Sequence, residues 1–377
     1  MKNQLNFLFI ALALLSGVRP SLGTVTNLAI APAGDHAVLI WPAGATNYIL
    51  QSATNLSAPD WATVSNAAPG TNLPVAYDSA ARFFRLSQNV VAPPGMALIP
   101  AGSFTIGDTL GEIGSAPPTN VYVSAFFMDT NLVTYYEQWS PVYAYANSHG
   151  YGFDNFGGAK GANNPVGNIN WYDAVKWCNA RSQQAGLTPV YYTDTGFTQV
   201  YTNGDVDIGN VNVNWSANGY RLPTSAEWEK AARGGLSGQR FPFGLTISES
   251  QANYSADTNN AYDLGPQGPN TNYDTSGYPF TSPVGSFAAN GYGLYDMAGN
   301  MNEWCWDWYS VPPYPAGSPY LGGTDPHGPS TENVHYRVAR GGGWSSDGGD
   351  LRCAFPNAFD PGAVANQTIG FRCVKGL

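Results

Sequence analysis

The sequence has 377 residues, of which 43% are hydrophobic and only 11% are charged, well below the ~25% typical of globular proteins. The formal net charge of −10 at pH 7 argues against nucleic-acid binding and against docking on an anionic membrane surface, because both need basic patches. The length suits two or three domains, and 44 glycines, 28 prolines and an aromatic content of 14% predict a loop-rich globular protein.

The first 23 residues have the pattern of a secretory signal peptide. Lys2 gives a short basic start, Phe7–Leu15 is an unbroken apolar run, and Ser21-Leu22-Gly23 offers small residues for cleavage. The run is shorter than the ~20 apolar residues that a membrane span needs, although an uncleaved anchor or a buried strand remains the alternative. We therefore expect cleavage after Gly23 and a secreted or periplasmic protein without a membrane span.

Residues 24–90 are predicted to form a small all-β, sandwich-like domain. Three candidate strands, at 37–41, 48–52 and 82–86, are separated by turn-rich segments and lack a helical period. Because this part holds no pattern that suggests chemistry, a structural or adhesive module is the simplest interpretation. The proline-rich residues 91–95 are a natural linker to the rest of the chain.

The remainder of the chain combines short helices, strands and long loops, which indicates the α+β class. Thr134 and Glu137 form a capping-box signature ahead of a predicted helix. Asn170 is placed to cap a helix at 171–185, and Thr224 begins another capping box.

Residues 236–290 are rich in Asn, Gly, Asp, Thr, Ser and Pro, and such a length without regular structure is unusual in a compact domain. Bound cations with oxygen ligands would order it, and so would turns that are hydrogen-bonded by Asp and Asn side chains. The residues alone do not separate these two alternatives.

Seven short sequence motifs, here called phrases, occur in order between residues 95 and 373. They are Gly95–Phe104, Asn164–Trp171, Tyr220–Glu229, Ser282–Phe287, Asn290–Trp304, Arg340–Trp344 and Gly370–Cys373. In this order they resemble the formylglycine-generating enzyme family, also called the sulfatase-modifying factor family. The resemblance implies an irregular α+β fold related to C-type lectins over residues 96–377.

The resemblance also implies an oxidase site, in which two closely spaced cysteines after an Arg-Gly-Gly phrase bind copper(I) as thiolates. Here Ser346 takes the first position, and the segment that would hold the second cysteine is shorter and has none. A serine hydroxyl stays protonated and is a hard donor, so we expect no catalytic residue and no copper.

The favoured function is therefore a non-catalytic module that binds a glycan or an exported protein. The alternative is an enzyme that modifies exported proteins through a variant active site, in which Ser346, Asp347 and Asp350 would lie where the thiols had been. A serine beside carboxylates, with no base nearby, makes a poor nucleophile.

Disulfides are a further implication of the resemblance. Cys178 and Cys373 match one family disulfide, Cys353 matches half of another whose partner position is alanine here, and Cys305 is left over. We expect the pairs Cys178–Cys373 and Cys305–Cys353, in keeping with export. A free and functional Cys305 is the alternative.

Structural calcium is also implied by the resemblance. The ligand positions of a first site are Asp296, Glu303 and the carbonyls of Gly299 and Met301, and those of a second are Asn253 and the carbonyls of Tyr254 and Tyr278. The usual carboxylate position of the second site reads Ser276. Hard oxygen ligands of this kind suit Ca²⁺.

The aromatic and proline-rich stretch 306–315 is a candidate ligand groove. Tyr309, Tyr314 and Tyr320 are expected to be exposed, where their rings would stack on a sugar or an extended peptide. Trp304 and Trp306 are expected to lie in the core.

Overall fold

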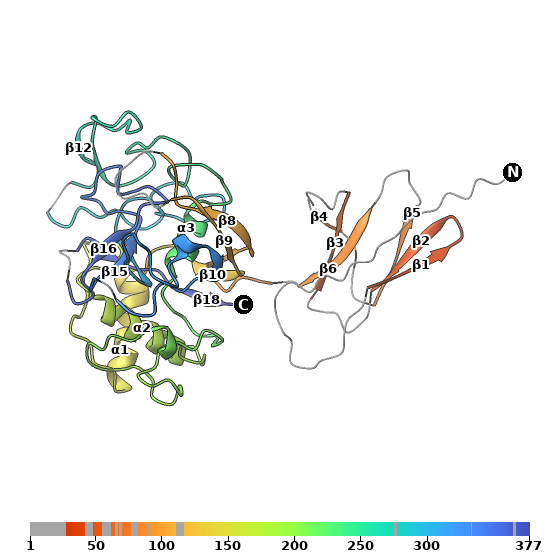
Figure 1. The fold of residues 1–377 in the computed structure, drawn as a ribbon, viewed down its shortest axis with the longest axis horizontal. Helices are drawn as coiled ribbons and strands as arrows, with labels where there is room; N and C mark the ends of the chain where they lie inside the picture. The colour runs from red at the N-terminus through yellow and green to blue at the C-terminus, as the bar shows by residue number, and fades with distance from the viewer. Residues whose placement is uncertain are drawn as a thin grey trace. The chain divides into compact units, whose positions relative to one another are not determined.

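The computed structural model describes residues 28–41, 48–54, 62–64, 67, 70–76, 82–88, 90–110, 117–274, 277–332, 334–364 and 367–377. The expected signal peptide at 1–23 lies outside these residues. The chain divides into two compact units, Met1–Val91 and Ala92–Leu377 (Figure 1). Within the described ranges, no helix is long and apolar enough to cross a membrane.

The first unit consists of two small antiparallel sheets. One has the order β1-β2-β5 and the other β4-β3-β6, from β1 (Ala29–Ala33), β2 (His36–Ile40), β3 (Tyr48–Ala53), β4 (Ala62–Thr63), β5 (Asn72–Ala76) and β6 (Phe83–Gln88). Leu39, Leu50, Val75 and Phe84 form an apolar cluster with residues from both sheets. The three strands expected from the sequence are confirmed, whereas an independent sandwich-like domain at 24–90 stays a prediction.

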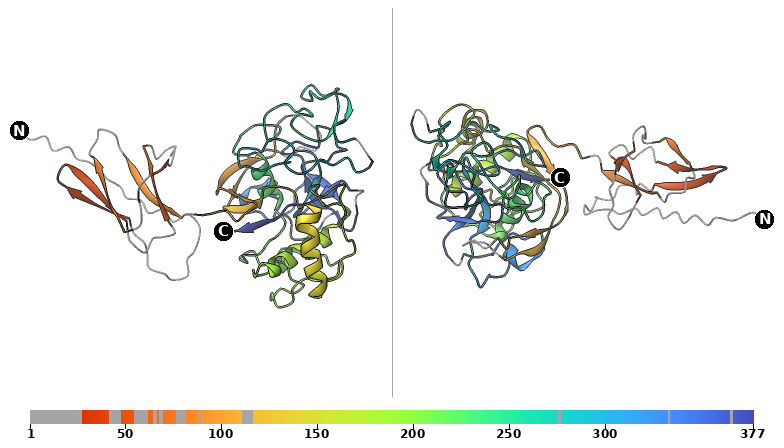
Figure 2. Two further views of the ribbon diagram at one scale, coloured as in Figure 1. Left: turned by 180° about the vertical axis from the view of Figure 1, so that it is seen from behind. Right: turned by 90° about the horizontal axis from the view of Figure 1, so that it is seen from above.

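The second unit is mostly strands and irregular loops with few helices, in keeping with the α+β class (Figure 2). Its sheets have the orders β18-β10-β7, β14-β9-β8, β16-β15-β13-β17 and β11-β12. The strands are β7 (Met96–Ile99), β8 (Gly102–Ile106), β9 (Thr119–Val123), β10 (Phe126–Asp129), β11 (Ser255–Ala256), β12 (Gly268–Pro269), β13 (Asn302–Trp308), β14 (Gly323–Thr324), β15 (Arg337–Arg340), β16 (Asn357–Phe359), β17 (Ile369–Gly370) and β18 (Val374–Gly376). The helices are α1 (Ser140–Ser148), α2 (Trp171–Gln184) and α3 (Ser225–Ala232), with single turns at Tyr135–Trp139, Asn210–Asn212 and Pro319–Leu321.

Strand β13 is the centre of the second unit, since all seven of its residues are buried. Trp304 and Trp306 belong to an apolar cluster that includes α1 and α2, which lie side by side. Cys305 points into a second cluster that includes α3. The expectation that the two tryptophans lie in the core is confirmed.

Two of the three predicted helix starts are confirmed. The Asn170 side chain accepts a hydrogen bond from the backbone of Asp173, whose carboxylate accepts from the Asn170 N–H in return. Thr224 and Glu227 make the same reciprocal pair at the start of α3. Each pair satisfies backbone donors that a helix start otherwise leaves free.

The capping box predicted at Thr134 is wrong. The chain forms a π-helical turn there, so the Gln138 side chain, and not Glu137, accepts from the Thr134 N–H at 2.9 Å. The Thr134 hydroxyl makes no capping bond. Because a π-helical turn is wider than an α-helical turn, the side chain that reaches the Thr134 N–H comes from residue 138 instead of residue 137.

The segment 236–290 is largely irregular, as expected. Asp263 is buried and accepts hydrogen bonds from the hydroxyl of Tyr254 at 2.5 Å and from the backbone of Asp257 and Gly265 at 2.7 and 3.0 Å. Of the two ways to order this segment, hydrogen-bonded turns around carboxylates are therefore present in the structure.

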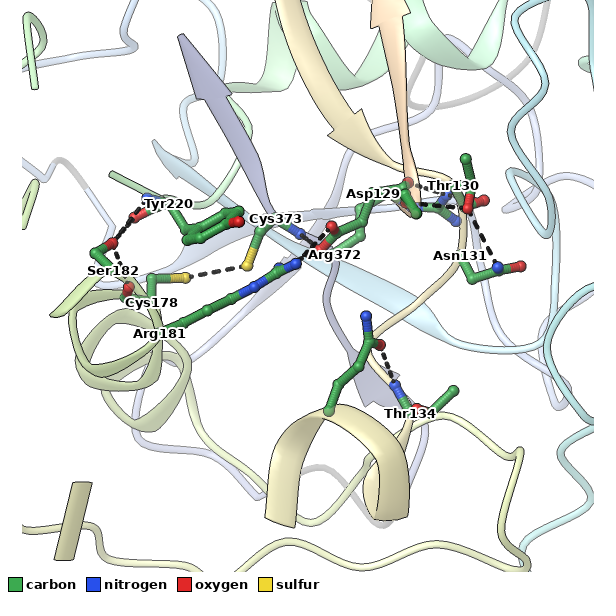
Figure 3. Close-up of polar contacts among 12 residues, drawn as sticks. Asp129, Thr130, Asn131, Thr134, Cys178, Arg181, Ser182, Tyr220, Arg372 and Cys373 are labelled. Carbon is green, nitrogen blue, oxygen red and sulfur yellow. Dashed lines mark hydrogen bonds and ion pairs between the residues drawn. The ribbon is translucent and has the colours of Figure 1, made fainter. Parts of the chain in front are cut away.

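A buried ion pair joins three distant parts of the second unit (Figure 3). Asp129, at the end of β10, accepts two hydrogen bonds from Arg181 of α2, at 2.6 and 3.0 Å, and one from the backbone N–H of Cys373 at 3.0 Å. The Arg181 guanidinium also lies 3.9 Å from the ring centre of Tyr220. A bidentate pair with this burial holds its partners in one geometry.

We expect Asp129→Ala to lower the free energy of unfolding by about 2–3 kcal/mol, because it leaves the partly buried Arg181 charge and the Cys373 N–H without their partner. Chemical denaturation followed by tryptophan fluorescence measures this. The exposed Glu137→Ala is the matched control and should change stability by less than about 0.5 kcal/mol. Equal effects of the two variants would contradict a structural role for the pair.

Candidate functional site

The segment that matches the family's oxidase site is a tight turn. Gly341 and Gly342 adopt φ values of +88° and +66°, and a Cβ on Gly342 would lie 2.5 Å from the Leu351 side chain. The Gly343 N–H then donates to the Ser346 hydroxyl at 3.2 Å, and the Ser346 N–H donates to the Gly343 carbonyl at 3.0 Å. The hydroxyl at the family's thiol position therefore closes a turn.

The titratable groups around Ser346 are carboxyl groups. Burial and the neighbouring charge of Asp347 raise the pKa of Asp350, and hydrogen bonding from Ser346 opposes that shift. Asp347 itself accepts from the Gly349 N–H at 2.7 Å. Among the described residues no histidine hydrogen-bonds to Ser346, and the one basic group that the structure shows in contact with its side chain is the Asp350 carboxylate.

None of the four cysteines takes position 346, and all four are fully buried free thiols in this structure. Burial raises the pKa of Cys178 and Cys305 well above the usual thiol value and that of Cys353 to about 12. Such thiols stay protonated at neutral pH, whereas copper(I) is bound by thiolates.

The two predicted disulfide pairs differ in what the structure shows. The sulfur atoms of Cys178 and Cys373 face each other at 3.5 Å (Figure 3). Cys305 and Cys353 belong to the same apolar cluster around α3. Both disulfides remain predictions.

The first calcium site has one residue that fits a cation well. Asp296 is only 6% exposed, and its Oδ1 atom is buried without a hydrogen-bond partner among the described residues. Its Oδ2 atom accepts from the Gly285 N–H at 2.8 Å. Burial raises the pKa of Asp296 to about 6. An unpaired buried carboxylate is unfavourable unless a cation or a proton neutralises it.

Asn131, which the sequence did not single out, lies beside the same loop. Its Oδ1 atom is also buried without a partner among the described residues, and a Cβ on Gly285 would lie 3.5 Å from it. Two orphaned oxygens thus flank Gly285. Asn131 stands 165 positions before Asp296 in the chain, so no local pattern could have connected them.

The other predicted carboxylate ligand, Glu303, already has hydrogen-bond partners on both of its oxygens. Both of its oxygens accept from Arg372, each at 2.7 Å, and one also accepts from the Trp228 indole at 2.9 Å. The Gly299 carbonyl accepts from the Met301 N–H at 2.9 Å. The fit to a cation in the first set therefore rests on Asp296.

The second calcium set fits less well. The Asn253 side chain donates from Nδ2 to the Phe280 carbonyl at 2.8 Å, and the Tyr254 carbonyl accepts from the Asn270 N–H at 3.2 Å. Tyr278 is 53% exposed, and Ser276 lies outside the described residues. Across the described ranges, no cluster of three or more His, Cys, Asp or Glu side chains is placed to hold a metal.

The expected exposure of the tyrosine groove needs correction. Tyr320 is only 8% exposed, because its ring packs in the apolar cluster around α3 and its hydroxyl accepts from Arg340 at 3.1 Å. Tyr309 and Tyr314 are partly buried against the same cluster. The cavity beside Tyr309 and Tyr320 measures about 10 Å³, which is the size of one water molecule.

A larger cavity, of about 300 Å³, lies outside every site that was predicted from the sequence. Its lining includes Trp215, Arg221, Glu227, Asp325 and His327. These residues come from the connection before α3, from α3 itself and from the loop after β14, so only the tertiary structure brings them together.

Comparison with known proteins agrees with the resemblance seen in the seven phrases. Residues 83–377 match the Sulfatase-modifying factor enzyme 1-like domain. The chain is 33% identical to the chaperone protein LppX of Paenibacillus barcinonensis over 294 residues, which cover 77% of this chain and 92% of that protein. It is 32% identical to the formylglycine-generating enzyme of Thermomonospora curvata over 310 residues, which cover 74% of this chain and 92% of the enzyme.

A solved structure with a similar fold is Treponema denticola variable protein 1. It has a TM-score of 0.55 and 28% sequence identity, and the match covers 75% of this chain and 95% of that protein.

Proposed function

This chain belongs to the sulfatase-modifying factor family, and we propose that it is a non-catalytic member that binds a glycan or an exported protein. The observation that carries the proposal is Ser346, whose hydroxyl closes a turn at the position where the family's oxidases place a thiol. A hydroxyl does not replace a thiolate as a ligand of copper(I).

The chemistry of the remaining groups supports the same proposal. The four thiols are buried, and burial raises the pKa of Cys178, Cys305 and Cys353. The relatives carry names as different as chaperone, formylglycine-generating enzyme and variable protein. One fold can serve several functions, so membership does not by itself imply oxidation.

The proposal includes a structural calcium ion near Asp296. Its Oδ1 atom would hold the cation, with the Gly299 and Met301 carbonyls of the predicted set and the Asn131 side chain nearby. The ion would neutralise a buried carboxylate that otherwise lacks a partner on one oxygen. Glu303 would contribute little, because Arg372 already neutralises it.

The proposal also includes export of the protein and a separate β-domain ahead of the family domain. A signal peptide at 1–23 would place the protein outside the cytoplasm, and the strands within 24–90 would form a separate sandwich-like module. An exported, non-catalytic module of this kind suits adhesion or scaffolding. The alternative function is an enzyme that modifies exported proteins through Ser346 and its neighbouring carboxylates.

We expect no formylglycine when the protein is incubated with copper(I), oxygen and a peptide that carries a sulfatase cysteine motif, because no thiolate pair is present to bind the metal. Mass spectrometry of the peptide measures the conversion. The Thermomonospora curvata enzyme, assayed in parallel, is the positive control. Turnover that disappears in Ser346→Ala would contradict the proposal and favour the variant enzyme.

We expect the stability of the metal-free protein to depend on pH through Asp296. Because its folded pKa is raised to about 6, the folded state holds this proton more tightly, and stability is lost as pH rises from about 4 to about 6. The loss should be on the order of 3 kcal/mol in EDTA, and Asp296→Asn should remove it.

Calcium should cancel this loss at pH 7, and at a concentration near 100 Kd it should add about 2.7 kcal/mol to the free energy of unfolding. The exposed-turn variant Asp194→Asn is the matched control and should keep the full calcium response. Identical unfolding curves with calcium and with EDTA, in the parent protein at pH 7, would contradict the calcium site.

A further inference from the structure

The cavity of about 300 Å³ lies against the N-terminal end of α3. Its walls come from the turn between β9 and β10, from the residues around Trp215, from the start of α3, and from the loop 325–327. Its volume is at the lower end of the range for small-ligand sites, ~300–1,000 Å³. Its lining mixes aromatic rings with charged and hydroxyl groups.

The charged groups of the lining are satisfied by one another or by the backbone. Arg221 donates to both oxygens of Glu227, at 2.6 and 2.7 Å. Asp325 accepts from the backbone and the hydroxyl of Ser124, at 2.6 and 2.7 Å. Behind the wall, Lys230 donates to the carbonyl of Val123 at 3.0 Å. Arg221 therefore balances Glu227, whereas Asp325 is held by neutral donors, so the lining offers no unpaired positive charge that would attract an anion.

His327 is the polar group of the lining that has no partner. Its ring lies parallel to the Trp215 indole, with ring centres 3.5 Å apart, and neither ring nitrogen hydrogen-bonds to any described residue. Burial and the charge of Arg221 lower the pKa of His327 to about 4. The imidazole is therefore neutral at pH 7 and presents one donor and one acceptor.

Two hydroxyl groups of the cavity lining can also make further hydrogen bonds. The Thr224 hydroxyl accepts from the Glu227 N–H at 3.2 Å and keeps its own proton to donate. The Ser124 hydroxyl donates to Asp325 and keeps lone pairs to accept. Phe126 and the Trp215 indole supply apolar surface next to these groups.

We propose that this cavity binds one neutral saccharide unit, with His327 as the residue that reads its hydroxyls. A sugar hydroxyl both donates and accepts, which matches the unpaired imidazole and the two hydroxyls, and the C–H face of the ring would lie on the apolar wall. A phosphate or a carboxylate would meet no unpaired positive charge in this lining. The inference rests on the proposed binding function and names its ligand class.

The test uses the full-length secreted chain and a panel of free sugars: neutral hexoses, N-acetylhexosamines and deoxyhexoses, with glucuronic acid and glucosamine as charged probes. Saturation-transfer NMR identifies the sugars that bind, and calorimetry gives the dissociation constants. We expect at least one neutral sugar to bind. His327→Phe keeps a flat ring on Trp215 but removes both nitrogens, so it should weaken binding at least tenfold.

The matched control is His149→Phe, since His149 also stacks on an aromatic ring, that of Tyr145 at 3.8 Å, but lies away from the cavity. This variant should bind like the parent protein. His327→Ala replaces His327→Phe if the latter does not fold, as judged by circular dichroism.

Three results would overturn the inference: unchanged affinity in the His327 variants, binding of the charged sugars alone, or no binding by any sugar of the panel. None of these results would be evidence for an oxidase function, because only turnover of the sulfatase peptide tests that function. Conversely, formylglycine formation would overturn the non-catalytic proposal and leave sugar binding at His327 to stand or fall on its own measurement.

Discussion

The second unit depends on one buried cation, Arg372. Its guanidinium is fully buried, and it donates to both oxygens of Glu303 and to the carbonyls of Asp129, Thr130 and Tyr295. A buried charge is tolerated only when such a set of partners surrounds it. The arginine therefore fixes the C-terminal segment, the central strand β13, the end of β10 and the loop before Asp296 in one arrangement.

In this arrangement the residues that hold the family's fold together differ from those that carry its oxidase chemistry. Glu303 and Arg372 belong to two of the phrases by which the family is recognised, and in this protein they neutralise each other inside the core. The charge left without a partner in that region is Asp296, which is why a cation is proposed there. The oxidase chemistry needs soft donors at only a few positions, so a serine at position 346 is compatible with the scaffold.

Local features of the fold could be predicted from the sequence, and long-range ones could not. The helix starts at Asn170 and Thr224 follow from side chains three residues apart, and the family follows from the order of its phrases. Tyr320 is predicted at the surface, but the structure buries it. Its burial depends on a hydroxyl contact with Arg340, which the local sequence does not indicate. The stack of His327 on Trp215 joins residues 112 positions apart, and no spacing rule indicates such a pair.

The central claim is that the buried thiols of this chain do not hold a redox metal. Titration of the reduced protein with copper(I) against a competing chelator, with bound copper counted per chain, tests this claim most directly. The account predicts that the chelator retains all of the copper. One copper held per chain, and lost when Cys305 or Cys353 is replaced by alanine, would contradict it.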